Sequence, residues 1–515
     1  MSCLVVSFIL QRILVSLSVM TSSAFMMQDG GLINEIGNLF GEALRGLSGE
    51  DEPAARAEFR MFQPEQQPNI KPNELDQKEF AGRILALSGA LQSWVTQTCQ
   101  LNAAQQTQLS ELVVKQLGTE KDRYARKSDP ERQNRPFGAS TPILFVQPDG
   151  AGTQFSGRLL KSIRDEILDD SQKEKLDAAV SDRTDFQKAA FREYVVAIFD
   201  RELFLTTEQR QAMLEYFSAN PDRITSPFYS FIAQTYYLPY KPLGGILTAS
   251  KAGFLDDRQK ARLKDLTSSA NNGPSNYIMF QSTEGPEQWA ENVKQAIVTQ
   301  RTIYLHAAAV RIGYLERSLK LTPEQVAYLT DASKGATTDA LAAWKESTQQ
   351  TIDQMQQQMA QMQGNFAFSA QNITTDGLDN NDIWSSAVKK VNADKQSGDR
   401  LTAIRNASAN AVTALLDQEL WLMPQQRNDV REFTKAALPR DTAVKSPYDD
   451  YVRELILLAY PLHKGDEPRI QAILSEPQLT IWKNLKEFLR WNKANNYLEI
   501  PLKNQGGSFT VQLAD

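Results

Sequence analysis

Leu205-Thr-Thr-Glu-Gln209 and Leu321-Thr-Pro-Glu-Gln325 are two of seven copies of one phrase, in which a glutamine follows a leucine by four positions. An apolar residue stands four positions beyond each glutamine. Recurrence of this kind indicates a repeat architecture. The leucines and glutamines of the seven copies are Leu101 and Gln105, Leu168 and Gln172, Leu205 and Gln209, Leu255 and Gln259, Leu321 and Gln325, Leu422 and Gln426, and Leu474 and Gln478.

The phrase predicts the start of an α-helix. Its second residue suits the N-cap, whose side chain accepts from a backbone N–H of the first turn, and the glutamine at N3 can accept from the backbone N–H of the cap. Pro323 then stands at N1, where a proline costs no hydrogen bond. We expect each phrase to begin the second helix of a helical hairpin. The predicted caps are Asn102, Asp169, Thr206, Asp256, Thr322 and Ser475, and Met423 departs from the rule.

The copies also predict a tandem duplication, because one nearly constant offset carries the first half of the chain onto the second. This offset takes Leu101 to Leu321, Leu205 to Leu422, and Leu255 to Leu474. The segment Asp200-Arg-Glu-Leu-Phe-Leu205 matches Asp417-Gln-Glu-Leu-Trp-Leu422. The copy at Leu168 has only a degraded counterpart, near residues 391–396. The predicted fold is therefore all-α, made of duplicated helical-hairpin repeats, with a small C-terminal β-hairpin at residues 497–502 and 508–513.

The domain boundaries follow from composition. Residues 1–24 are predicted to be a signal peptide, because Arg12 precedes an apolar run and Ser22 and Ala24 suit the cleavage site. A membrane anchor is the alternative interpretation of this segment. Residues 25–75 are expected to hold an amphipathic helix and a linker rich in Pro, Gln and Glu. Copy one is predicted at 76–270, and copy two at 287–515 with a Gln/Met-rich insert at 348–382.

The insert has two interpretations. Leu341, Thr348, Met355 and Met362 recur at heptad spacing, with Ile352 and Met359 between them, which favours a coiled-coil seam. The alternative is a Cu(I) site formed by the thioethers. Residues 376–382 carry many oxygen ligands but lack the spacing of an EF-hand, so a solvated loop is expected there.

Few residues suggest catalysis or a cofactor. The chain has two histidines, His306 and His463, and we expect both to be structural. Cys99 is the one thiol beyond the predicted signal peptide, which excludes an intramolecular disulfide in the mature chain. The sequence has no glycine-rich phosphate loop, and its net charge of −6 argues against a nucleic-acid partner. We therefore predict a protein that is not an enzyme, with no cofactor and no metal.

Acidic residues recur before two of the phrases, as Asp200 and Glu202 in one copy and Asp417 and Glu419 in the other. Carboxylates near the C-terminus of a helix oppose its dipole, so their recurrence indicates a fixed partner. Arg210 and Arg427, just across the turn, are predicted to form structural ion pairs with them. A metal or acid/base role is the alternative.

Aromatic residues gather in both copies after a recurring Ser-Pro pair. They are expected either to pack between hairpins or to line a groove that recognises a partner, since tyrosine offers apolar area and a polar tip. The candidate partner-binding residues are Phe228, Tyr229, Phe231, Tyr236, Tyr237, Tyr240, Tyr448, Tyr451 and Tyr460.

The Leu-Thr-x-x-Gln phrases at Leu205 and Leu321 resemble the LTxxQ motif of the periplasmic Spy and CpxP family. The resemblance is limited to the repeated motif. It implies a helical, exported protein of the cell envelope, with chaperone-like or stress-sensing activity.

The functional expectation is an exported helical scaffold, periplasmic or secreted, that binds polypeptides or envelope components. It would contact a membrane only through its N-terminal segment. The alternatives are a surface-layer component that self-associates and, less favoured, an enzyme whose site is assembled between helices.

Overall fold

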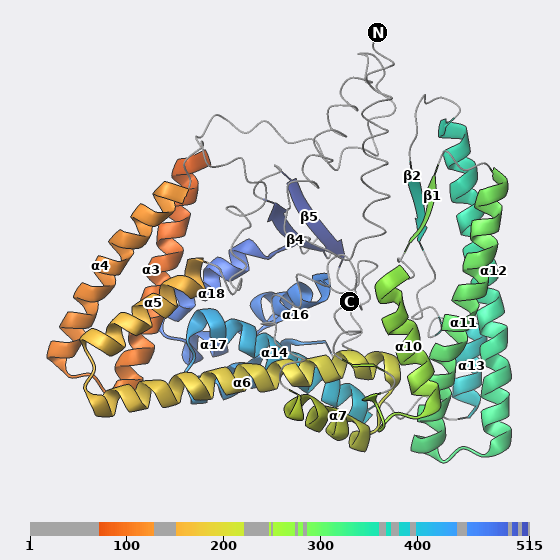
Figure 1. Cartoon of the computed structure of the whole chain (residues 1–515), viewed down its shortest axis with the longest axis horizontal. Helices are drawn as coiled ribbons and strands as arrows, with labels where there is room; N and C mark the ends of the chain where they lie inside the picture. Colours follow the sequence, from red (N-terminus) through yellow and green to blue (C-terminus); the bar gives the residue numbers. More distant parts are fainter. Residues whose placement is uncertain are drawn as a thin grey trace, which may run out of the picture. The chain divides into compact units, whose positions relative to one another are not determined.

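The computed structural model of this chain is built almost entirely of α-helices (Figure 1). Within the described residues there are fourteen helices and five short strands, which confirms the all-α prediction. The predicted signal peptide and the amphipathic helix after it lie outside the described residues. Those residues are 72–127, 151–220, 247–248, 251–272, 277–281, 286–359, 367–371, 378, 381–391, 398–439, 451–492, 497–502 and 507–512.

The first helix in the described part begins inside the segment predicted to be a linker, at Pro72 rather than after residue 75. The helices of the first predicted copy are α3 (Pro72–Cys99), α4 (Ala103–Lys127), α5 (Ala151–Glu166), α6 (Asp170–Leu203), α7 (Thr207–Ala219) and α10 (Asp257–Asn272). Those of the second are α11 (Pro286–Leu319), α12 (Pro323–Met359), α13 (Asp382–Lys390), α14 (Gly398–Leu420), α15 (Pro424–Ala437), α16 (Tyr451–Lys464), α17 (Glu467–Ile473) and α18 (Glu476–Phe488).

Every one of the seven phrases begins a helix, as predicted. Five of the predicted caps accept a hydrogen bond from the backbone N–H of their glutamine: Asn102, Asp169, Thr206, Asp256 and Thr322. Ser475 instead donates its hydroxyl to Gln478 Oε1 at 3.0 Å. All seven glutamines accept from the backbone N–H of the cap residue, including Met423.

The glutamines also join the phrases in pairs, which the sequence did not predict. Gln209 and Gln259 exchange two hydrogen bonds through their amides, at 2.7 and 2.9 Å. Gln209 Nε2 also donates to Phe254 O, and Gln259 Nε2 donates to Leu203 O. Each amide thus makes four hydrogen bonds, which is its full capacity. The other two pairs are Gln105 with Gln172 and Gln426 with Gln478.

This pairing explains why the phrase carries glutamine rather than glutamate. A glutamate also completes a capping box, because only its oxygens are needed there. The pair requires a donor and an acceptor on each side chain, and two carboxylates at this distance would repel. In each pair one glutamine donates to a carbonyl at the end of another hairpin's first helix, which is Cys99 O, Leu203 O or Leu420 O.

Four phrases follow a residue with a positive φ that is not glycine: Gln100, Phe204, Lys320 and Trp421, with φ between 49° and 54°. This left-handed conformation is costly for residues with a Cβ and is stabilised here by the helix-end hydrogen bonds. The first member of each glutamine pair follows such a residue, and the second member does not. The local geometry agrees with the duplicated order of the phrases, although the tandem duplication itself stays a prediction.

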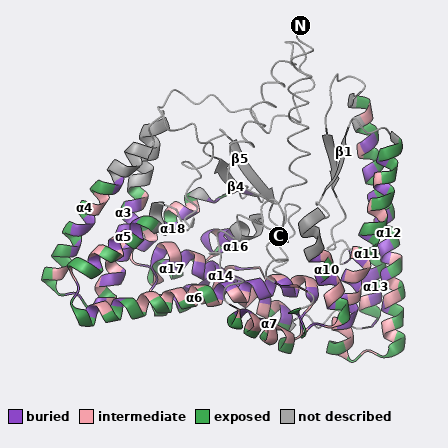
Figure 2. Ribbon diagram, viewed as in Figure 1, coloured by how far each residue is buried: buried purple, intermediate pink, exposed green. Residues whose placement is uncertain are grey.

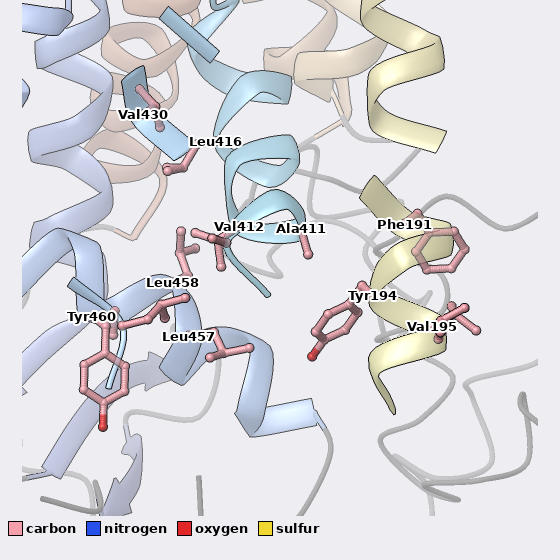
Figure 3. Packing of buried hydrophobic residues seen from close by; sticks show 14 of the residues in the cluster. Phe191, Tyr194, Val195, Ala411, Val412, Leu416, Val430, Leu457, Leu458 and Tyr460 are labelled. Atoms are coloured by element: carbon pink, nitrogen blue, oxygen red, sulfur yellow. The ribbon is translucent and has the colours of Figure 1, made fainter. Parts of the chain in front are cut away.

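The main core lies where α6, α7 and α14 meet α15, α16 and α18. The apolar residue four positions after each glutamine is buried in all seven copies, as in Met213 and Val430. Figure 3 shows Tyr194 and Phe191 of α6 in this cluster with Val412 and Leu416 of α14. In Figure 2 the hairpin helices carry one buried and one exposed face, the pattern of amphipathic helices on a shared core.

A second cluster joins α11, α12 and α13, around Tyr304, Leu329 and Trp384. Val391, the predicted counterpart of Leu168, is buried in this cluster, against which Leu321 also packs. The rest of that degraded counterpart lies outside the described residues. Among the residues that are described, Gln325 has no second glutamine across from it.

The predicted C-terminal β-hairpin is present, and the described residues contain further β-structure that was not predicted. The C-terminal strands β4 (Tyr497–Leu502) and β5 (Gly507–Gln512) are neighbours in a sheet, with β3 (Arg490–Asn492) on the far side of β4. A second, antiparallel pair joins β1 (Tyr277–Gln281) to β2 (Ala367–Gln371). The sequence predicts a break between copies at β1 and an insert at β2, because strands this short give no periodic signal.

The predicted insert begins within a helix, since α12 continues to Met359. Leu341, Thr348 and Ile352 are buried on it, at the positions predicted for the seam. The side chains of Met355, Met359 and Met362 lie outside the described residues. Asn381, from the predicted solvated loop, caps α13 and donates to Asp339 at 2.8 Å.

We predict that Gln259→Glu lowers the free energy of unfolding by about 3 kcal/mol, because it leaves Leu203 O without its donor and sets a carboxylate against Gln209 Oε1 in a buried site. The matched control is Gln325→Glu, where the capping box needs only an oxygen, and we expect a change within about 0.5 kcal/mol. Urea unfolding followed by circular dichroism measures both. Equal losses would show that the glutamines act only as caps.

Candidate functional site

The two recurring aspartates lie buried at the ends of the two long helices that carry them. Asp200 of α6 and Asp417 of α14 are both fully inaccessible to solvent. Asp200 Oδ1 accepts from Leu205 N at 2.7 Å, and Asp417 Oδ1 accepts from Leu422 N at 3.0 Å. Each carboxylate therefore closes the turn into the following helix, and buried charges of this kind require cationic partners.

For each aspartate, one such partner comes from the other long helix. Arg400 of α14 lies with Nε 3.1 Å from Asp200 Oδ1 and donates from Nη2 to Asp200 O at 2.7 Å. Arg183 of α6 lies with Nε 3.0 Å from Asp417 Oδ2 and donates from Nη2 to Asp417 O at 2.6 Å. The offset that carries Asp200 to Asp417 also carries Arg183 to Arg400. We refer to these two contacts as the crossed pairs.

Each arginine also covers the aromatic ring that follows its aspartate by four positions. The Arg400 guanidinium lies 4.0 Å from the centre of the Phe204 ring, and that of Arg183 lies 3.8 Å from the Trp421 ring. A cation over an aromatic face is stabilised further when both are desolvated. Phe204 and Trp421 have positive φ, so the crossed pairs also fix the two sharp turns.

A hydrogen bond between equivalent positions lies near the midpoint between the crossed pairs. Asn410 Nδ2 donates to Glu193 Oε2, and the same offset carries Glu193 to Asn410. Helices α6 and α14 therefore meet through equivalent residues near their centre, and near each end an arginine of one helix pairs with the aspartate of the other. This is the contact pattern of a twofold interface. Figure 1 shows α6 and α14 lying along each other.

Burial lowers the pKa of both arginines from the ordinary value, and the partner aspartates oppose that shift. Arginine nevertheless stays charged in proteins, because its ordinary pKa is so high. Gln187 adds a further bond to the second pair, donating to Asp417 Oδ2 at 2.9 Å. The crossed pairs are thus charged contacts whose oxygen acceptors are occupied.

Two of the predicted ion pairs have different outcomes. Arg210 Nη1 lies 3.1 Å from Asp200 Oδ2, which is the predicted pairing. Arg427 pairs with Asp182 instead of Asp417, so that prediction was wrong. The reason is that Arg183 and Gln187 already occupy the outer oxygen of Asp417. Glu202 pairs with Arg262 of α10, and Glu419 is partly buried on α14.

The aromatic candidates are mostly outside the described residues: Phe228, Tyr229, Phe231, Tyr236, Tyr237, Tyr240 and Tyr448. Tyr451 is the first residue of α16, and its side chain is not described. Tyr460 is buried and packs edge-on against Trp491, with ring centres 5.6 Å apart. Of the two alternatives, Tyr460 therefore follows the first: its side chain packs in the core and does not line an open groove.

The histidines and the cysteine have protein partners. His306 Nδ1 lies 2.7 Å from Asp265 Oδ2 of α10, a carboxylate distant in sequence, and His463 contacts Leu489 O. Cys99 is buried and unpaired in any disulfide, with Sγ 3.7 Å from Gln172 O. Burial raises the pKa of its thiol to about 11, so it is a thiol rather than a thiolate at neutral pH.

Within the described part of the chain, no group of three His, Cys, Asp or Glu side chains is arranged to hold a metal ion. Among the same residues, no helix is long and apolar enough to span a membrane. Comparisons of this chain with protein-family models, with curated proteins and with solved structures gave no match. Inference about function therefore depends on the contacts themselves.

The residues that sequence reasoning missed are Arg183 and Arg400. The sequence did contain an indication of them, because the offset that relates Asp200 to Asp417 also relates Arg183 to Arg400. It was overlooked because each arginine lies several helical turns before the aspartate of its own copy and pairs with the other one.

We predict that Arg400→Ala lowers the free energy of unfolding by about 3 to 5 kcal/mol, since Asp200 would keep a buried charge with one partner fewer. Arg183→Ala should cost a similar amount. The control is Arg431→Ala, whose partner Glu432 is exposed and 3.3 Å away, with an expected change below about 0.5 kcal/mol. Chemical unfolding of the three variants decides this, and three similar values would contradict a structural role for the crossed pairs.

Proposed function

We propose that this chain is an exported helical scaffold that binds polypeptides or components of the cell envelope. The observation that best supports a scaffold is where the polar side chains shared by the repeats make their contacts. Paired glutamines and crossed arginines bond to other helices of the same chain rather than converging on an open site. Such contacts hold helices at fixed positions, which suits a protein whose work is binding.

The N-terminal sequence supports export. Its Arg12, apolar run and small residues at 22 and 24 have the order of a cleavable signal peptide. The LTxxQ resemblance points to the same compartment and to a chaperone-like or stress-related role. We place the protein in the periplasm or outside the cell, or anchored by its N-terminus if the signal is retained.

Exposed apolar side chains on the first hairpin offer surface for an unfolded partner. Leu85 of α3 is 60% exposed, and Val114 of α4 is 70% exposed. Large apolar side chains in water are common singly and mark binding surfaces where they gather. The tyrosines between residues 229 and 240, which lie outside the described residues, are proposed as further partner-binding residues.

The test is whether the chain from Phe25 onward suppresses the aggregation of a client that is unrelated in sequence. Reduced insulin is suitable, because the reductant that makes it aggregate breaks no disulfide in this chain, where Cys99 is a free thiol. We expect light scattering to fall as the chain is raised from substoichiometric to equimolar amounts. The apolar and aromatic surface would cover the client's exposed residues.

The variant that tests the surface replaces Tyr229, Tyr236 and Tyr237 with serine and should lose suppression. The control replaces Tyr328 with serine, a tyrosine that is 40% exposed on α12 and lies against Lys390. It should keep suppression. A folded, helical wild type that leaves scattering unchanged would overturn the chaperone-like role.

A further inference from the structure

The two copies differ in the partner that they give to one partly buried carboxylate. The offset between the copies carries Glu202 of α6 to Glu419 of α14. Glu202 forms an ion pair with Arg262, which is buried on α10. The offset that carries Gln259 to Gln478 carries Arg262 to Ile481, which is also buried.

The glutamine pairs place α10 against the end of α6, and α18 against the end of α14, in equivalent positions. Gln259 Nε2 donates to Leu203 O at 2.9 Å, and Gln478 Nε2 donates to Leu420 O at 2.8 Å. Helix α18 therefore meets the end of α14 as α10 meets the end of α6. The position that supplies an arginine to Glu202 in the first copy holds an isoleucine in the second.

The charged groups near Glu419 do not replace that arginine fully. Arg183 of α6 and Arg83 of α3 attract its carboxylate, but Arg183 is already bound to Asp417, on the same helix as Glu419. Arg427 of α15 is paired with Asp182. Removal from water is the largest influence on Glu419, and it raises the pKa of this carboxyl to about 8.

We propose that Glu419 is a proton-linked switch, whose neutral form fits the packing of α14 against α18 and whose ionised form weakens it. Releasing the proton to solvent leaves a carboxylate that lacks the counterpart of Arg262, because Ile481 stands at that position. The second copy is thus the half of the chain that responds to pH. An exported protein meets the pH of its surroundings, and the switch does not depend on which partner the scaffold binds.

The sign of the effect follows from the folded and unfolded pKa values. Glutamate in the unfolded chain has an ordinary pKa, so it releases its proton at lower pH than the folded chain does. The contribution of Glu419 to stability is complete below that ordinary value. It is lost progressively as pH rises toward about 8 and does not change further above it.

Thermal unfolding of the full chain, followed by circular dichroism from about pH 6 to about pH 9, tests the proposal. The difference in Tm between the wild type and Glu419→Gln isolates this group from the histidines. We expect wild-type Tm to fall relative to Glu419→Gln as pH rises. The matched control, Glu202→Gln, breaks the pair with Arg262 and should lower Tm at every pH while keeping the wild-type slope.

Infrared spectroscopy supplies a second readout that a merely structural residue would not change. The folded wild type should show a protonated carboxyl band near neutral pH that disappears with a midpoint near 8. Glu419→Gln should lack it. Parallel Tm profiles for the wild type and Glu419→Gln, or a folded wild type without that band, would overturn the proposal.

Discussion

The exchange of arginines between α6 and α14 is the interaction on which the rest of the core depends. Each long helix supplies an arginine to the buried aspartate of the other, and each arginine lies against the aromatic ring at the following turn. The turns direct α7 and α15, which complete the core with α16 and α18. If the two long helices separated, both guanidinium groups would lose their aspartates, Asp417 would lose Arg183 and Gln187, and Asp200 would keep only Arg210.

The glutamine pairs extend this order along the chain. One pair of glutamine amides joins two hairpins through hydrogen bonds between uncharged groups. The same interaction can therefore recur wherever two helix starts lie side by side. Each pair satisfies the backbone N–H groups of two caps, and one of its glutamines also donates to a carbonyl at a helix end, as Gln259 does to Leu203 O. The copy at Gln325 retains the cap alone among the described residues, and it offers a natural comparison for the energy of pairing.

Much of the fold could be predicted, because the strongest signals are local. The capping phrase is short and a helix start needs little else, so all seven starts were predicted correctly. The glutamine pairs were not predicted. Gln105 and Gln172, for example, are far apart in sequence, and nothing within either phrase indicates which other phrase it will pair with. Arg427 was assigned to Asp417 by closeness in sequence, and two side chains from α6 occupied that aspartate instead.

The candidate site was predicted less completely than the fold. The recurrence of Asp200 and Asp417 correctly indicated fixed partners, while the identity of the crossed arginines required the packing of the two halves. Among the aromatic candidates, Tyr460 is the one whose side chain is described, and it is buried, the packing alternative that the sequence left open.

Native-state hydrogen exchange, read by mass spectrometry of peptides from residues 187–203 and 404–420, tests the central claim most directly. The crossed pairs predict that both segments open together, with the same free energy, equal to that of global unfolding. Exchange of one long helix while the other stays protected would contradict the account, because neither helix could then depend on the other for its charge partners.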